Sequence, residues 1–268
     1  MTINIEQLKK EIIKTASEEL IPRFQKIDSR RKIDGSLVTE ADLAVQQRLT
    51  QSLNKAYPQI PLLGEEMPTE TQQQILEDSP NGFWCLDPLD GTSNYVAGMP
   101  CFATSLAYIR RDEVEIGIIY DPLRDECFHA IRGEGAWLNG KPLHLENTSD
   151  QIDTCVAMVD FKRLSEKLAS QLATRPPYRS QRSIGSVALD WCWLAAGRLE
   201  LYLHGGSKLW DYSAGSLIFS EAGGLHRLTE GAVSLPAAAK LGLSPKMAIA
   251  APNEALFEAW RDWLSQYD

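Results

Sequence analysis

The sequence predicts an α/β (α+β) protein in which helices and sheets are stacked in layers. Apolar residues recur at helical spacing near the start of the chain, and short apolar runs, too short for helices, begin near residue 60. Strand-like and helix-like segments alternate in both halves of the chain, which is typical of layered architecture. With 268 residues and 44% apolar side chains, the chain can bury one large core or two smaller ones.

Two amphipathic helices are expected first. The first covers residues 3–25, and its apolar face is formed by Ile5, Leu8, Ile12, Ile13 and Leu20. The second covers residues 39–56, with Thr39 as its N-cap and an apolar side formed by Leu43, Leu49 and Leu53.

Short strands follow these helices. Buried strands are expected at 60–64 and 82–86, because both runs are apolar and end in acidic or turn residues. Three β-rich segments at 102–109, 114–120 and 127–131 are separated by turn sequences, which indicates an antiparallel meander. The glycines and the asparagine of GEGAWLNGKPL (133–143) predict a hairpin.

A polar stretch around residues 145–153 is the predicted boundary between an N-terminal α+β lobe (1–150) and a C-terminal α/β lobe (151–268). Strands and helices alternate beyond it. Strands are expected at 154–160, near 182, at 199–203 and at 247–251, and helices at 162–172, 186–196, 211–221 and 254–264.

Composition excludes several classes of protein. The net charge of −9 and the lack of a basic stripe argue against nucleic-acid binding. The five cysteines are odd in number and scattered through apolar segments, as in a reduced, cytoplasmic protein. The N-terminus lacks the apolar segment of a signal peptide, and no apolar run approaches the ~18 residues that span a bilayer. We therefore expect neither export nor membrane insertion.

Acidic residues stand at the junctions between apolar runs and turns in four segments: VTEAD ending at Asp42, GEE at 64–66, DPLDGT at 87–92, and WDYSAG at 210–215. Grouping buried carboxylates is costly unless a cation neutralises them. Mg²⁺ suits such a group because it prefers a few carboxylates, water and substrate phosphate as ligands. Each segment alone is a common turn or cap, so the prediction depends on their joint presence.

The DPLDGT segment has the stereochemistry that a metal and phosphate site needs. Pro88 disfavours helix at Asp87, so this aspartate stays at the end of a strand while the chain turns and Asp90 converges on it. The Leu89 carbonyl is a further possible ligand. Gly91 allows backbone amides to approach an anion, and Thr92, at the start of a short helix, offers a hydroxyl and an amide to a phosphate.

These motifs resemble the lithium-sensitive, Mg²⁺-dependent phosphatases of the inositol monophosphatase family. The resemblance rests on GEE, DPLDGTSNY (87–95) and WDYSAG, with KIDGSLVTEAD (32–42) and the sequence around 185–200 in support. It implies a layered αβαβα sandwich of the inositol monophosphatase and fructose bisphosphatase type, usually a homodimer. It also implies two or three Mg²⁺ ions per site and inhibition by Li⁺.

The resemblance also implies roles for individual residues. Glu65, Asp87 and the Leu89 carbonyl would hold one Mg²⁺, Asp87, Asp90 and Asp211 a second, and Glu65 would share a third. Thr92, supported by Asp42, would orient and help deprotonate the attacking water, with Glu65 counted in the catalytic set. The Gly91 and Thr92 amides would bind the phosphate. The substrate side would be formed by Gly185, Ser186, His204 and Lys32, with Arg31 as the alternative to Lys32.

His204 departs from the family pattern. The position seven residues before the aspartate of the WD motif is typically a glutamate that contacts inositol hydroxyls. A carboxylate can only accept hydrogen bonds from a polyol, whereas a histidine can donate one. The expected substrate is a small phosphorylated metabolite, with inositol 1-phosphate or a related polyol or sugar phosphate leading. Bisphosphate nucleotidase, histidinol phosphatase and fructose bisphosphatase activities remain alternatives. A non-catalytic regulatory or binding protein on the same scaffold is an alternative of another class.

Overall fold

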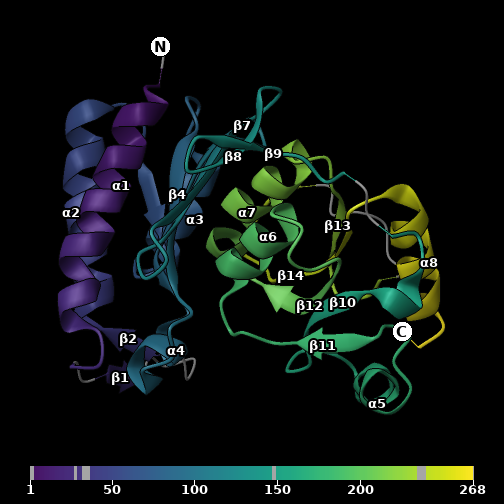
Figure 1. Ribbon diagram of the computed structural model, residues 1–268. Coiled ribbons are helices and arrows are strands. Elements are labelled where there is room, and N and C mark those ends of the chain that lie inside the picture. The colour runs from purple at the N-terminus through teal and green to yellow at the C-terminus, as the bar shows by residue number, and fades with distance from the viewer. Residues whose placement is uncertain (1–2, 27–28, 32–36, 147–148, 234–239, 268) are drawn as a thin grey trace.

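The computed structural model describes residues 3–26, 29–31, 37–146, 149–233 and 240–267. Five layers follow one another across the molecule (Figure 1). Helices α1 (Ile5–Glu19) and α2 (Glu40–Ala56) form the first layer, and a seven-stranded sheet forms the second. Helices α6 (Val187–Ala195) and α7 (Leu209–Glu221) separate it from a five-stranded sheet, whose outer face carries α5 (Glu166–Thr174) and α8 (Glu254–Ser265). The expected αβαβα sandwich is confirmed.

The seven-stranded sheet has the order β3-β4-β5-β6-β7-β8-β9. Its strands are β3 (Leu62–Gly64), β4 (Phe83–Asp90), β5 (Ala103–Arg110), β6 (Glu113–Asp121), β7 (Glu126–Ile131), β8 (Gly135–Leu138) and β9 (Lys141–Leu143). Only the β3–β4 pair is parallel. The meander and the following hairpin are therefore as predicted. Because β3 is parallel to β4, the residues after both strands lie at the same edge of the sheet.

The five-stranded sheet has the order β11-β10-β12-β14-β13. Its strands are β10 (Val156–Asp160), β11 (Ser180–Arg182), β12 (Leu201–Ser207), β13 (Leu225–Thr229) and β14 (Lys246–Ala251). β10 runs parallel to both β11 and β12, whereas β14 is antiparallel to its neighbours β12 and β13. The C-terminal ends of β10 and β12 therefore meet at one edge, and α7 starts directly after β12.

The central helices α6 and α7 are apolar almost all round, because both sides of this layer face a sheet. Close packing holds α7 in place: a Cβ at Gly117 of β6 would lie 2.6 Å from the Ala214 carbonyl oxygen, and one at Gly215 would lie 2.4 Å from Trp191 Cβ. One apolar cluster contains residues of the first sheet, of α6 and α7, and of the second sheet. The division of the chain near residue 150 stays a prediction.

Several elements differ from the sequence-based expectations. The first helix ends at Glu19 and continues as the 3₁₀ turn η1 (Ile21–Arg23), since Pro22 disfavours α-helix at the residue before it. α5 begins at Glu166, not near residue 162. Leu43 was expected on the apolar side of α2 but is 51% exposed, because the buried side contains Ala41, Val45, Leu49 and Leu53.

The remaining elements are short. The structure adds β1 (Ser29–Arg31), β2 (Leu37–Thr39), α3 (Thr69–Glu77), η2 (Ile152–Thr154) and β13, which the sequence analysis did not predict. The short helix expected at Thr92 is α4 (Thr92–Ala97). Within the described ranges, no helix combines the length and the apolar character needed to cross a membrane.

Candidate metal centre

Asp87 and Asp90 are brought to one side of β4 by a bulge. Opposite β5, Asp87 pairs with Ser105 and Asp90 with Ala103, so three steps on β4 face two steps on β5. In a regular strand, residues three apart point to opposite faces, and one extra residue corrects this. Pro88 sits in the bulge, where no ladder hydrogen bond from its nitrogen is needed, and its carbonyl accepts a hydrogen bond from Thr104 Oγ1 at 2.9 Å.

Three carboxylates converge at this edge. Oxygen atoms of Asp87, Asp90 and Asp211 all lie within 4.8 Å of one another. Burial raises the pKa of Asp87 and of Asp211 well above the ordinary value, and the neighbouring carboxylates raise both further. Burial likewise raises the pKa of Asp90 to about 6, although the hydrogen bond from Ser186 opposes the rise. The cluster therefore concentrates negative charge that is unfavourable without a cation.

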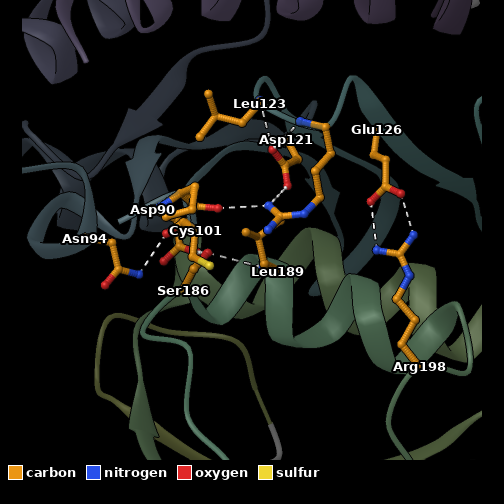
Figure 2. A network of polar contacts seen from close by, with 11 residues as sticks. Asp90, Asn94, Cys101, Asp121, Leu123, Glu126, Ser186, Leu189 and Arg198 are labelled. Carbon is orange, nitrogen blue, oxygen red and sulfur yellow. Dashed lines mark hydrogen bonds and ion pairs between the residues drawn. The ribbon is translucent and has the colours of Figure 1, made fainter. Parts of the chain in front are cut away.

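Asp90 also caps helix α6, which comes from the other half of the chain. Its Oδ2 accepts hydrogen bonds from the Ser186 hydroxyl and from the Ala188 amide at 2.8 Å, and its Oδ1 accepts one from the Val187 amide at 3.3 Å. Figure 2 shows Asp90 and Ser186 together at the start of this helix. A carboxylate at a helix N-terminus is stabilised by the amides and by the helix dipole. Ser186, expected on the substrate side, thus contacts a predicted metal ligand.

The turn before α6 is fixed by Asn94 of α4. Its Nδ2 donates to the Cys101 carbonyl at 2.8 Å and to the Ile184 carbonyl at 2.6 Å. Gly185 has a φ of +75°, and a Cβ there would lie 3.2 Å from Asn94 Oδ1. The other end of α6 is held by an ion pair between Arg198 and Glu126, also visible in Figure 2. Both ends of α6 are therefore tied to the first sheet.

Asp211 reaches the cluster from the first turn of α7. Its Oδ2 accepts the Lys208 amide at 2.7 Å, which fixes the carboxylate at the helix start. Asp87 is oriented in a similar way, because its Oδ1 accepts the Leu89 amide at 3.0 Å. Each of the three carboxylates is thus held by backbone amides of a defined element.

Glu65 follows β3 directly and is half-buried. Its amide donates to the Leu86 carbonyl at 3.1 Å, and its carbonyl accepts from Gln72 Nε2 at 3.2 Å. The Glu65 charge is the largest electrostatic contribution that raises the pKa of Asp87. Glu65 therefore belongs to the same acidic site, next to Asp87.

Thr92, Asp42 and Leu89 form a second group beside the carboxylates. Thr92 Oγ1 lies 3.0 Å from the Leu89 carbonyl oxygen and 3.3 Å from Asp42 Oδ1, so its hydroxyl hydrogen has two acceptors. The other oxygen of Asp42 accepts the Thr39 amide at 2.7 Å in the capping box of α2. Burial raises the pKa of Asp42 to about 6. Gly91 adopts a left-handed φ of +87° at the N-cap of α4.

His204 lies in β12 and not in a loop. It is 2% exposed, its Nε2 is 3.1 Å from Asp160 Oδ2, and its Nδ1 accepts the Gly206 amide at 3.2 Å. The hydrogen bond with His204 lowers the pKa of Asp160 to about 2. Both ring nitrogens of His204 are thus engaged within the protein.

Sequence reasoning missed Asp160 and Asn94. Asp160 had no signal, because its partner His204 is far along the chain. Asn94 stands inside the quoted DPLDGTSNY motif, and its place after DPLDGT is a signal that sequence reasoning left unused. Lys32 and the side chain of Arg31 lie outside the part of the chain that the structure describes, so the role expected of one of them stays a prediction.

The residues present fit a hard divalent cation. Among the described residues, no lysine or arginine forms an ion pair with Asp87, Asp90 or Asp211, although the first two are buried and the third is half-buried. An all-oxygen donor set with several carboxylates suits Mg²⁺, Mn²⁺ or Ca²⁺ rather than a thiolate-preferring metal. Asp87, Asp90 and Asp211, with Glu65 and the Leu89 carbonyl beside them, are the groups that would hold it.

Comparison with known proteins places the chain in a family. The model of the "Inositol monophosphatase family" matches residues 3–262. Nus factor SuhB of Pasteurella multocida is 36% identical over 208 residues, 76% of each chain, and inositol monophosphatase 1 of Solanum lycopersicum is 37% identical over 196 residues, 70% of this chain and 71% of that protein. The extragenic suppressor protein suhB from Bartonella henselae has a crystal structure that superposes with a TM-score of 0.81 at 26% identity, covering 98% of both chains. The chain belongs to the inositol monophosphatase family.

Proposed function

We propose that this protein is a Mg²⁺-dependent phosphatase that hydrolyses a small phosphate monoester. The observation that carries the proposal is the convergence of Asp87, Asp90 and Asp211 within 4.8 Å from two different halves of the chain. The relative named inositol monophosphatase 1 supports inositol 1-phosphate or a related polyol or sugar phosphate as the substrate. Two or three ions per site, and the homodimer, stay predictions.

Cations bound by these carboxylates would supply positive charge that acidifies water and stabilises the transferring phosphoryl group. Thr92 orients the water, and its hydroxyl accepts the proton that the water loses while passing its own to Asp42. With a pKa of about 6, Asp42 is ionised at neutral pH and able to take that proton. The bond from phosphorus to the water oxygen forms as the bond to the alcohol oxygen breaks, and the leaving alkoxide takes a proton from solvent. The Gly91 and Thr92 amides, at the start of α4, would bind the phosphate.

Phosphate release with and without Mg²⁺ tests this proposal. Inositol 1-phosphate, fructose 1,6-bisphosphate, 3′-phosphoadenosine 5′-phosphate and histidinol phosphate cover the substrate classes in question. We expect release from at least one of them in Mg²⁺ and none in excess EDTA. Release that is unchanged by EDTA would contradict the metal assignment.

A second candidate is a non-catalytic role on the same scaffold. The relatives named Nus factor SuhB, which are 33–36% identical to this chain, favour it. Binding of the same four compounds without any release of phosphate would support this candidate against the phosphatase.

A further inference from the structure

Helix α3 buries an amide side chain where a surface helix normally buries an apolar one. Its sequence, TETQQQILE, is mostly polar, and Gln72, 4% exposed, is its fully buried residue. Ile75 and Leu76 are half-buried beside it and pack against the apolar cluster. Burying an amide costs free energy unless its polar atoms form hydrogen bonds. The partners of Gln72 therefore show what α3 contributes to the molecule.

Gln72 contacts the turn that contains Glu65. This turn, at 64–67, is closed by the Met67 amide, which donates to the Gly64 carbonyl at 3.2 Å. Gln72 Nε2 donates to the Gly64 carbonyl at 2.8 Å and to the Glu65 carbonyl at 3.2 Å. The turn follows β3, which is an edge strand of the seven-stranded sheet. One side-chain amide thus binds two successive carbonyls at the end of an edge strand.

A second glutamine, Gln46 of α2, holds the next peptide of the same turn. Its Oε1 accepts the Glu66 amide at 3.2 Å. Gly64 makes room for this contact, because a Cβ there would lie 2.3 Å from Gln46 Oε1, so a side chain at position 64 would displace Gln46. Helices α2 and α3 therefore each contribute one glutamine to the turn.

Together these contacts fix the backbone of Glu65. The peptide before it is held by the Gly64 carbonyl, bonded to Gln72, and by the Glu65 amide, which donates to a carbonyl of β4 at 3.1 Å. The peptide after it is held by the Glu65 carbonyl, again bonded to Gln72, and by the following amide, which donates to Gln46. Because a peptide unit is planar, fixing the planes on both sides of a residue fixes its φ and ψ, and with them the direction of its Cα–Cβ bond. Gln72 contacts both planes, and Gln46 contacts the second.

The direction of the Glu65 side chain matters because Asp87 is its neighbour across two strands. β3 and β4 are parallel, and Gly64 is paired with Leu86. Glu65 and Asp87 are each the next residue along the chain, so their side chains start from corresponding positions. A rotation of the Glu65 backbone would change the separation of the two carboxylates, which a shared cation has to bridge.

We propose that Gln72, together with Gln46, positions Glu65 for metal binding, so that removing either amide weakens the binding of the cation that Glu65 and Asp87 share. This inference rests on the proposed function, because it takes Glu65 as a metal ligand. Groups that orient a ligand without touching the metal typically change metal affinity by about 10- to 100-fold when they are removed. Both glutamines are positioning residues and take no part in the chemical step.

Binding of Mn²⁺, followed by electron paramagnetic resonance of the free ion, tests the inference without turnover. Mn²⁺ is suited to carboxylate ligands. Gln72→Met keeps the length of the side chain and removes its donor, so we expect the Kd for Mn²⁺ to rise by about 10-fold. Gln46→Met should have a smaller effect, because Gln46 holds one plane. Gln74→Met is the matched control, since it replaces an exposed amide of the same helix, and it should bind Mn²⁺ as the wild type does.

A double-mutant cycle with Glu65→Gln separates positioning from a general loss of stability. Glu65→Gln should itself weaken Mn²⁺ binding, and Gln72→Met should weaken it no further in that background, because the ligand that Gln72 positions is already lost. The same cycle with Gln46→Met gives the answer if Gln72→Met does not fold. An equal fold-change in the wild-type and Glu65→Gln backgrounds would overturn the inference. Wild-type binding by Glu65→Gln, or by both glutamine variants, would overturn it as well.

Phosphate release separates this inference from the phosphatase proposal. We expect Gln72→Met to need about 10-fold more Mg²⁺ for half-maximal activity and to keep a kcat near that of the wild type at saturating Mg²⁺. The expected Mn²⁺ coupling without any phosphate release from the wild type would support the positioning role and contradict the phosphatase. Release without the coupling would support the phosphatase and contradict the role of Gln72.

Discussion

At the scale of single residues, Asp90 joins two functions that are usually separate. It is one of three clustered carboxylates, and it also accepts three hydrogen bonds from Ser186, Val187 and Ala188 at the start of α6. The helix contacts hold the carboxylate in one orientation, and they oppose the rise of its pKa that burial causes. The placement of α6 and the placement of a predicted metal ligand therefore depend on the same side chain.

Asp90→Asn tests this residue. The amide keeps one oxygen acceptor but loses the negative charge, so affinity for Mg²⁺ should fall. We expect kcat/KM to decrease by more than about 100-fold. This is a larger loss than that caused by removing a hydrogen bond that only supports a metal ligand. Ser186→Ala is the control, since it keeps the charge of Asp90 and removes only the hydroxyl that donates to Asp90 and accepts the Leu189 amide, and it should cost about 10-fold. Unimpaired Mg²⁺-dependent phosphate release by Asp90→Asn would contradict its assignment as a ligand.

At the scale of elements, the sequence predicted most of the helices and strands whose buried apolar residues recur at regular spacing. α2 begins after its Thr39 cap as expected, and β5 to β7 form the predicted meander. α3 escaped prediction because its sequence, TETQQQILE, is mostly polar, and the only residue of this helix that is fully buried is Gln72. β13 escaped because its residues are mostly half-buried or exposed and show no clear alternation.

The site was predicted where its residues form contiguous motifs and missed where partners are distant. Asp87 and Asp90 stand in one segment, whose proline and glycine already indicate a special turn. The contact between Asp90 and Ser186 spans 96 residues, and the pairing of β10 with β12 decides that Asp160 meets His204. No local pattern encodes such contacts, because they follow from the order of strands in the sheet.

The packing of α7 gives a prediction at this scale. A Cβ at Gly117 would lie 2.6 Å from the Ala214 carbonyl oxygen and 2.9 Å from its Cα, so Gly117→Ala must displace α7 and, with it, Asp211. We expect a loss of about 1–3 kcal/mol in the free energy of unfolding, typical of overpacking, and a higher Mg²⁺ concentration for half-maximal activity. Chemical denaturation and a Mg²⁺ titration measure the two effects. Gly242→Ala is the control, because nothing lies within 4 Å of its Cβ position. Equal Mg²⁺ requirements in both variants would contradict the coupling.

At the scale of the whole molecule, the site joins the two sheets. Asp87 and Asp90 belong to the first sheet. Asp211 lies in the first turn of α7, which is placed between the two sheets and follows β12 of the second sheet along the chain. Like charges within 4.8 Å oppose this arrangement when no cation is present. We therefore expect a cation bound there to stabilise the layered structure as well as to take part in the chemistry.

Stability should accordingly depend on Mg²⁺. A ligand that binds only the folded state stabilises it by RT ln(1 + [L]/Kd), so Tm should rise continuously as Mg²⁺ is added to protein freed of metal with EDTA. The rise should be larger at pH 7.5 than at pH 5.5. Metal binding requires ionised carboxylates, and the pKa of Asp90 is raised to about 6, so protons compete with the metal at the lower pH.

Two variants with the same change in charge decide whether these carboxylates cause the effect. Asp211→Asn should abolish most of the Mg²⁺-dependent rise in Tm, because it removes the ligand that comes from the second half of the chain. Asp153→Asn, at an exposed position in η2, should show the full wild-type rise. Differential scanning fluorimetry with Mg²⁺ and, as a control for ionic strength, with NaCl measures both. An equal rise in the two variants would mean that Mg²⁺ stabilises the protein elsewhere, and the carboxylate cluster would lose its assignment as the metal centre.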